Sequence, residues 1–165
     1  MSIVATKRKL VGICGGQWGD SGVGKTTLAN ILAKEMGFYP ASFAEPIKDV
    51  ARKIFGWDGA MNAESRLLLD RICRMGRSIS EDYWRDLVMT RLPKDQDKIA
   101  FDDVYFDNEM RLIIGNGGII VRIVRGGFNT PTFPCVTIDI ENNGSLTDFS
   151  KKSVLTLLSA IEDLA

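Results

Sequence analysis

The sequence contains no histidine, and this absence narrows the chemistry that the 165-residue chain can perform. Without an imidazole there is no Ser-His-Asp triad, no Cys-His pair and no zinc site with histidine ligands. Any reaction that the chain catalyses must therefore use carboxylates, cations or a bound metal.

Cysteine is scarce as well, because Cys14, Cys73 and Cys135 lie far apart and show no paired spacing. Such a pattern offers neither a disulfide framework nor a metal-binding set. No apolar run approaches the roughly 20 residues of a membrane span, and the N-terminus lacks the apolar core of a signal peptide. We therefore expect a cytoplasmic protein, kept in reducing intracellular surroundings, with no membrane partner.

Net charge is the third missing feature, since 21 Lys and Arg residues balance 21 Asp and Glu residues. A neutral chain produces no overall field for a polyanion, so we expect no nucleic-acid partner. With 45% hydrophobic and 25% charged residues, the composition is that of a globular protein. The length predicts one domain over residues 1–165, with residues 1–8 as a flexible N-terminal tail.

The sequence does contain an alternation of short apolar strands and amphipathic helices. Strands are predicted at 10–14, 98–101, 119–124 and 134–140, and helices around 28–36, 46–55, 64–75, 81–92, 108–116 and 154–161, the fourth opened by Ser80 as N-cap. Strands separated by helices need crossover connections, which favour a mainly parallel sheet. The pattern predicts an α/β fold of three layers, with helices on both faces of the sheet.

The strongest chemical signal is Gly19-Asp20-Ser21-Gly22-Val23-Gly24-Lys25-Thr26, which matches GxxxxGK[ST] between a predicted strand and a predicted helix. Its glycines allow positive φ and close backbone approach, so successive N–H groups converge on phosphate oxygens at a helix N-terminus. Lys25 adds a cation at the β and γ phosphates, and the Thr26 hydroxyl is a ligand for Mg²⁺. The motif predicts a P-loop that binds ATP and Mg²⁺ through Gly19, Asp20, Ser21, Gly22, Val23, Gly24, Lys25, Thr26 and Thr27.

Charged residues at predicted strand ends are candidates for the same site. Asp102 and Asp103 end an apolar strand, where ligand sites of open α/β sheets lie, and either suits a metal-binding carboxylate. The alternative is that the two acids only cap an exposed strand end. Arg125 ends a later strand and is a better candidate than Arg122 for contact with a transferring phosphate.

Arginines and aromatic residues offer candidates for a second substrate. Four arginines lie within or just after one predicted helix: Arg66, Arg71, Arg74 and Arg77. Guanidinium groups bind phosphate bidentately, which favours a phosphate-bearing substrate, and ordinary surface ion pairs are the alternative. Three aromatic residues are candidates for stacking on a base, with core packing as the alternative for each: Phe43, Trp57 and Trp84.

Beyond the P-loop, several segments follow one another in a familiar order. They are residues 43–48 (Phe-Ala-Glu-Pro-Ile-Lys), 66–69 (Arg-Leu-Leu-Leu), 76–77 (Gly-Arg), 82–84 (Asp-Tyr-Trp), 103–109 (Asp-Val-Tyr-Phe-Asp-Asn-Glu) and 118–123 (Gly-Ile-Ile-Val-Arg-Ile). Together they resemble the phage-type deoxynucleoside monophosphate kinases, a family of P-loop nucleoside monophosphate kinases. The resemblance implies a P-loop NTPase fold and phosphoryl transfer from ATP to a deoxynucleoside monophosphate, with Mg²⁺. The expected partner is this nucleoside monophosphate, and a homodimer is left open.

The resemblance also implies a role for individual residues. Lys25, Arg125 and Asp103 would form the catalytic set, with Thr26 and Asp103 as the metal ligands. The substrate-binding residues would be Phe43, Arg66, Arg77 and Trp84. Phosphoryl transfer suits a chain without histidine, because it depends mostly on positioning and charge neutralisation.

The chain departs from the family's pattern at three places. Tyr105 stands where the family's motif usually has arginine, and the segment between Arg125 and Cys135 is too short for more than a short lid. Residues 15–18 lengthen the approach to Gly19. Two alternatives therefore stay open, namely another small-molecule kinase on the same scaffold and a nucleotide-binding module without catalytic activity.

Overall fold

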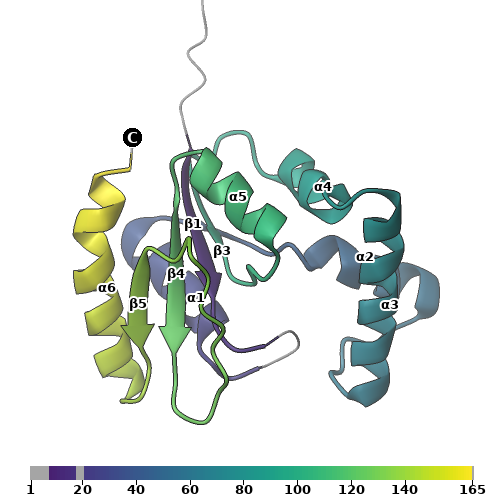
Figure 1. The fold of residues 1–165 in the computed structure, drawn as a ribbon, viewed down its shortest axis with the longest axis horizontal. Helices are drawn as coiled ribbons and strands as arrows, with labels where there is room; N and C mark the ends of the chain where they lie inside the picture. Colours follow the sequence, from purple (N-terminus) through teal and green to yellow (C-terminus); the bar gives the residue numbers. More distant parts are fainter. Residues whose placement is uncertain (1–7, 18–20, 165) are drawn as a thin grey trace, which may run out of the picture. The chain divides into compact units, whose positions relative to one another are not determined.

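A five-stranded sheet is the framework of the computed structural model, which describes residues 8–17 and 21–164 (Figure 1). The strands are β1 (Lys9–Cys14), β2 (Tyr39–Ala41), β3 (Lys98–Phe101), β4 (Ile119–Val124) and β5 (Ile138–Glu141), and their order in the sheet is β2-β3-β1-β4-β5. All four neighbouring pairs are parallel. The predicted α/β class with a parallel sheet is therefore confirmed.

The chain divides into two compact units. Unit 1 is formed by residues up to 41 and from 93 onward and contains the whole sheet, whereas unit 2 is formed by residues 42–92. The single domain expected from the sequence stays a prediction. Of the expected tail, residues 1–7 lie outside the described part, and Arg8 donates a hydrogen bond of 2.9 Å to the Pro93 carbonyl.

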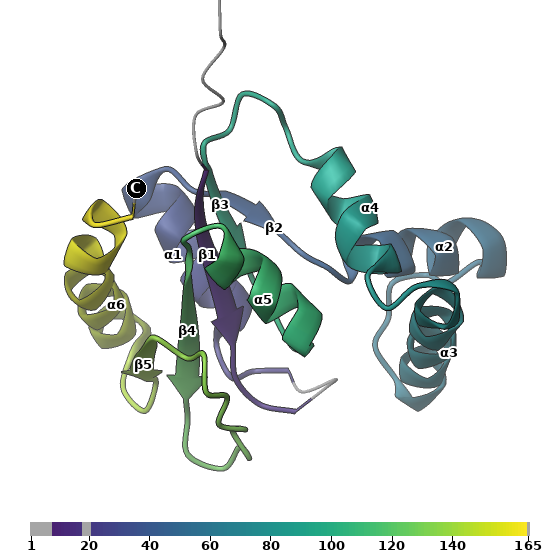
Figure 2. The same ribbon diagram turned by 45° about the horizontal axis from the view of Figure 1, so that its top comes forward.

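Helices cover both faces of the sheet in unit 1, as predicted (Figures 1 and 2). Helices α1 (Lys25–Met36) and α6 (Leu146–Glu162) lie on one face and α5 (Asp107–Gly115) on the other. Alternate residues of a strand point to opposite faces of the sheet. Val11 and Ile13 of β1 point to one face and belong to the buried cluster with Leu157 of α6. Between them, Gly12 leaves room for α5, since a Cβ there would lie 2.6 Å from the Ile113 side chain.

The connection from β4 to β5, residues 125–137, contains no helix and runs back along the face of the sheet that carries α5. Arg122 of β4 donates to the Thr132 hydroxyl at 2.7 Å, and the Thr137 N–H donates to the Ile120 carbonyl at 2.8 Å. The strand predicted at 134–140 is therefore wrong at its start, because pairing begins only at Ile138. Pro134 has no N–H to donate, and a turn closes at 133–136 instead.

One strand, β2, has no counterpart among the predicted elements. It has three residues, contains Pro40 and lies at the edge of the sheet. Proline is tolerated at an edge because its missing N–H breaks no ladder on the open side. So short a segment gives no periodic signal, and only its pairing with β3 makes it a strand.

Unit 2 consists of α2 (Glu45–Phe55), α3 (Ala63–Ile79) and α4 (Tyr83–Arg91). Helix α3 continues past its predicted end, so Ser80 is its C-cap, and Asp82 takes the N-cap position of α4. The predicted N-cap role of Ser80 is wrong because the longer α3 leaves only a tight turn, closed by a Tyr83 N–H to Ser80 carbonyl bond of 3.1 Å. In the described part of the chain, no helix combines the length and apolarity that crossing a membrane requires.

Candidate functional site

The carboxyl edge of the parallel sheet brings together several residues that the sequence separates. Gly15 follows β1, Asp102 follows β3, Arg125 follows β4 and Asn142 follows β5. Carboxyl ends of parallel strands lie at one edge, which is where open α/β sheets bind ligands. The P-loop lies at this edge as well, because it connects β1 to α1.

The described part of the P-loop has the backbone of an anion-binding nest. Gly22 and Gly24 are left-handed, with φ of 89° and 116°, and Val23 between them has negative φ. Alternation of left-handed and right-handed residues directs successive N–H groups toward one point. Gly24 is also the N-cap of α1 and makes no side-chain cap, and the N-terminus of a helix favours the binding of an anion. Of the predicted motif, Gly19 and Asp20 lie outside the described residues.

The ammonium group of Lys25 reaches back across the loop. Its Nζ donates to the Gly15 carbonyl at 2.9 Å. Gly15 has φ of 142°, and a Cβ there would lie 2.6 Å from the Ile123 carbonyl of β4. Only glycine therefore fits at this position, and the lengthened approach to the P-loop supplies the carbonyl that orients Lys25.

A hydrogen bond joins the start of α1 to the end of β3. The Thr26 hydroxyl donates to Oδ2 of Asp102 at 2.8 Å. A hydroxyl beside a carboxylate is an oxygen donor set that fits Mg²⁺, which takes one or two carboxylates together with phosphate oxygens and water. No group of three or more candidate metal ligands occurs among the described residues, so a metal here would depend on the nucleotide for further ligands. The expectation that Asp103 is the metal ligand stays a prediction.

Arg125 reaches the P-loop from the end of β4. Its Nη1 donates to the Gly22 carbonyl. Phe128, three residues further on, lies beside the same glycine, since a Cβ on Gly22 would lie 3.7 Å from its ring. The start of the β4–β5 connection therefore contacts the phosphate-binding loop, even though this connection is short.

Several of these residues line a pocket of about 460 Å³ within unit 1. Its lining is formed by residues 21–27 and Arg125, together with residues of the turn after β5 and of the first turn of α6, namely Asn142, Gly144, Leu146 and Phe149. The pocket thus combines cationic and amide groups with apolar side chains. A nucleotide combines the matching groups, charged phosphates and an apolar base.

The four expected substrate-binding residues all lie in unit 2. Phe43 and Trp84 are buried, and Trp84 donates its indole N–H to the Cys73 carbonyl at 2.9 Å. The structure gives both rings a packing role within this unit, and their contact with a base stays a prediction. Arg66 is exposed near the start of α3.

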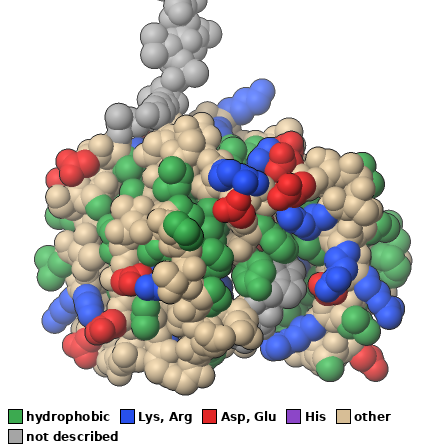
Figure 3. Space-filling view, in the orientation of Figure 1, with side chains coloured by type: hydrophobic (Ala, Val, Ile, Leu, Met, Phe, Trp, Pro, Cys, Tyr) green, Lys and Arg blue, Asp and Glu red, His purple; other side chains and the backbone are tan. Residues whose placement is uncertain are grey.

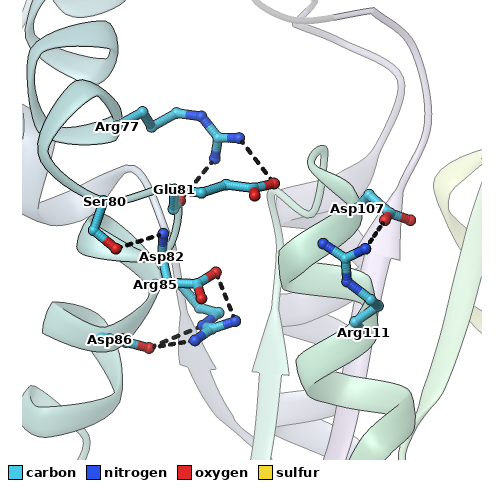
Figure 4. A network of polar contacts seen from close by, with 8 residues as sticks. All are labelled: Arg77, Ser80, Glu81, Asp82, Arg85, Asp86, Asp107 and Arg111. Atoms are coloured by element: carbon cyan, nitrogen blue, oxygen red, sulfur yellow. Dashed lines mark hydrogen bonds and ion pairs between the residues drawn. The ribbon is translucent and has the colours of Figure 1, made fainter.

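Arg77, near the end of α3, forms an ion pair with Glu81 in the turn that leads to α4 (Figure 4). Its Nη1 donates to the Glu81 carbonyl at 3.2 Å, and its Nη2 lies 3.7 Å from the Glu81 carboxylate. Arg85 pairs with both Asp82 and Asp86. On the face shown in Figure 3, charged side chains of both signs lie intermixed.

Cys14, the last residue of β1, is not a nucleophile. All three cysteines are free. Burial raises the pKa of the Cys14 thiol to about 12, although the positive charge of Arg122 lowers it. The thiol is therefore protonated at neutral pH and unreactive.

The sequence alone does not single out the pocket residues that follow β5, which are Asn142, Gly144, Leu146 and Phe149, nor Phe128, which lies beside the P-loop. Asn142 lies in an Asn-Asn-Gly segment that is typical of a turn, and it directly follows β5 in the structure. The rule that singled out Asp102 and Arg125, position at a strand's carboxyl end, applies to it equally. Phe128 gave no signal, because its contact with Gly22 depends on the path of the β4–β5 connection.

No protein-family model matches the chain. Among solved structures, the chain is similar to a gluconokinase from Sinorhizobium meliloti 1021, with a TM-score of 0.54, 12% sequence identity, and 96% of each chain covered. It is also similar to the dephospho-CoA kinase from Campylobacter jejuni, with a TM-score of 0.53, 13% identity, and coverage of 94% of this chain and 98% of that one. At such low identity the similarity shows the fold, which is that of the P-loop kinases.

Proposed function

We propose that the chain is an ATP-dependent kinase and that its acceptor is a deoxynucleoside monophosphate. The observation that carries the proposal is the pocket in unit 1, where P-loop amides, Lys25 and Arg125 surround one space of about 460 Å³. Amides at a helix N-terminus, an ammonium and a guanidinium are the groups that bind polyphosphate. The P-loop kinase fold also supports an ATP-dependent kinase.

In the proposed reaction an oxygen of the acceptor's phosphate forms a bond to the γ-phosphorus of ATP, and the bond from that phosphorus to the β–γ bridging oxygen breaks. The products are ADP and the deoxynucleoside diphosphate. Lys25 steadies the transferring group, and Arg125 neutralises charge on its oxygens. Thr26, with Asp102 or Asp103, would hold Mg²⁺, which when bound neutralises charge on the β and γ phosphates.

The acceptor part of the proposal depends on unit 2. Arg66 and Arg77 lie eleven positions apart on α3, which places them about 16 Å apart along the helix axis. At that spacing Arg66 and Arg77 would contact the acceptor separately and would not act together as one bidentate pair. Arg77 is the less exposed of the two and is held by Glu81, so a bound phosphate would replace this ion pair.

The test is an assay of ADP release with each deoxynucleoside monophosphate in turn. We expect turnover on at least one acceptor, and a loss of about 100-fold or more in Lys25→Ala, because a cation at the transferring phosphate is removed. Lys34→Ala is the matched control, since Lys34 lies on the same helix but is exposed and pairs with Glu35. Absence of Lys25-dependent turnover on every acceptor would end the proposal.

A second candidate is a kinase for another small molecule. Tyr105, which replaces the family's usual arginine, favours it, as do the two similar structures, which are named for gluconate and dephospho-CoA. A panel of thermal shifts separates the candidates, because a ligand that binds the folded state raises its melting temperature. ATP binding without turnover on any acceptor would instead indicate a non-catalytic module.

A further inference from the structure

The side chain of Asn142 contacts the P-loop from outside the motif. Its Nδ2 donates to the Val23 carbonyl at 2.8 Å, and the residue is half-buried in the lining of the pocket. A Cβ on Gly24 would lie 2.5 Å from the same nitrogen. The amide of Asn142 therefore occupies the space that a side chain at position 24 would fill.

This contact fixes the direction of a P-loop N–H. A trans peptide is planar, so its carbonyl and the N–H of the next residue point in opposite directions. By holding the Val23 carbonyl, Asn142 determines where the Gly24 N–H points. Arg125 acts in the same way one peptide earlier, because it holds the Gly22 carbonyl and hence the Val23 N–H.

The loop needs such support because its own backbone is soft. Gly22 and Gly24 have no Cβ and adopt positive or negative φ with little difference in energy. Without an outside contact, the peptides between them can rotate, and each rotation turns an N–H away from the nest. The support must therefore come from residues with fixed positions.

Asn142 has such a position. Its backbone N–H donates to the Val124 carbonyl at 2.8 Å, which continues the pairing of β4 with β5 by one residue. Ser145, three residues later, caps α6 by accepting from the Asp148 N–H at 3.2 Å. The residue is thus held between a strand and a capped helix.

We infer that Asn142 is a positioning residue of the nucleotide site, which orients the Gly24 amide toward a bound polyphosphate. The inference rests on the proposed function in that it takes the pocket to bind phosphates. It assigns Asn142 to binding of the phosphates of the nucleotide and not to recognition of its base. Its removal should therefore weaken binding of any polyphosphate, whether or not a nucleoside is attached.

The experiment measures dissociation constants of the full chain for ATP and for inorganic tripolyphosphate by titration calorimetry. Asn142→Leu keeps the branching of the side chain at Cγ but removes the donor. We expect both ligands to bind about five- to tenfold more weakly, by the same factor, as for the loss of one hydrogen bond. In the active enzyme the KM for ATP should rise and kcat fall, with the KM for the acceptor unchanged.

Asn116→Ala is the matched control, because Asn116 also donates from its side-chain amide to a carbonyl, that of Leu112 at 2.7 Å, at the exposed end of α5. This variant should bind both ligands like the wild type. Asn142→Ala repeats the measurement should the leucine variant not fold. If both Asn142 variants melt far below the wild type, the residue has a structural role and the inference is wrong.

Other outcomes are equally decisive. Weaker binding of ATP alone would assign Asn142 to the base, and unchanged binding of both ligands would remove its role, so either result overturns the inference. A wild-type protein that binds tripolyphosphate but phosphorylates no acceptor contradicts the proposed function and leaves the inference standing. A wild type that binds neither ligand contradicts both.

Discussion

The Thr26 hydroxyl donates a hydrogen bond of 2.8 Å to the Asp102 carboxylate, so the P-loop residue proposed to bind the metal is joined to the end of β3. This hydrogen bond favours Asp102, whereas position at the strand end suits both acids and the family resemblance implies Asp103. In an enzyme that uses Mg²⁺, a carboxylate in contact with a ligand hydroxyl orients the metal site.

Asp102→Asn is therefore expected to affect metal dependence more than Asp103→Asn. Replacing the carboxylate with an amide removes a negative charge beside the metal position, and about 10–100 times more Mg²⁺ should be needed for half-maximal turnover. The measurement is a magnesium titration of ADP release in both variants. A larger effect of Asp103→Asn would instead support the assignment that the family resemblance implies.

Gly76 of α3 and Trp84 of α4 pack against each other within unit 2, which gives a stability prediction. A Cβ on Gly76 would lie 2.4 Å from the indole ring, and the ring is held by its hydrogen bond to Cys73. Gly76→Ala should therefore lower the free energy of unfolding by about 1–3 kcal/mol, as overpacking of a buried contact does. Denaturant unfolding measures the change.

The control for this prediction is Gly115→Ala at the end of α5. No atom lies within 4 Å of a Cβ there, and the backbone is one that alanine adopts. We expect a neutral result or a gain of about 0.4–1 kcal/mol, because alanine has fewer unfolded conformations than glycine. A Gly76→Ala protein as stable as the wild type would show that the ring moves aside at no cost.

Elements with a strong local signal could be predicted from the sequence. Helix α1 begins at Lys25 and ends before Gly37, whose φ of 73° makes it the left-handed C-cap that its position indicates. The strand at 119–124 has its predicted bounds, because five of its six residues are β-branched and this composition needs no tertiary contact to be recognised. The P-loop belongs to this group as well.

Features that depend on distant parts of the chain could not be predicted. The short strand β2 exists through its pairing with β3, and the start of β5 depends on how the β4–β5 connection crosses the sheet. The contact of Asn142 with Val23 joins residues 119 positions apart. A turn signal fixes the local backbone but says nothing about which carbonyl a side chain reaches.

Arg122 and Asp139, on the adjacent strands β4 and β5, give a prediction of pH dependence. Arg122 Nε donates to Oδ1 of Asp139 at 2.7 Å, and this hydrogen bond lowers the pKa of the Asp139 carboxyl below its ordinary value. A carboxyl with a lowered pKa in the folded state stabilises the protein above its unfolded pKa, near 4. That contribution is lost as the pH falls through the folded pKa.

Asp139→Asn should therefore be less stable than the wild type at pH 7, and the difference should shrink as the pH falls below about 4 and vanish once the wild-type carboxyl is protonated in the folded state. The expected difference at pH 7 is about 0.2–1 kcal/mol, because the Asp139 side chain is 47% exposed and solvent screens the pair. Urea unfolding at a series of pH values measures this difference in stability.

Glu141→Gln is the matched control, since it removes a carboxylate of the same strand whose pair with Lys152 is more exposed. A difference between Asp139→Asn and wild type that stays constant down to pH 2 would mean that Asp139 acts through packing and not through its charge.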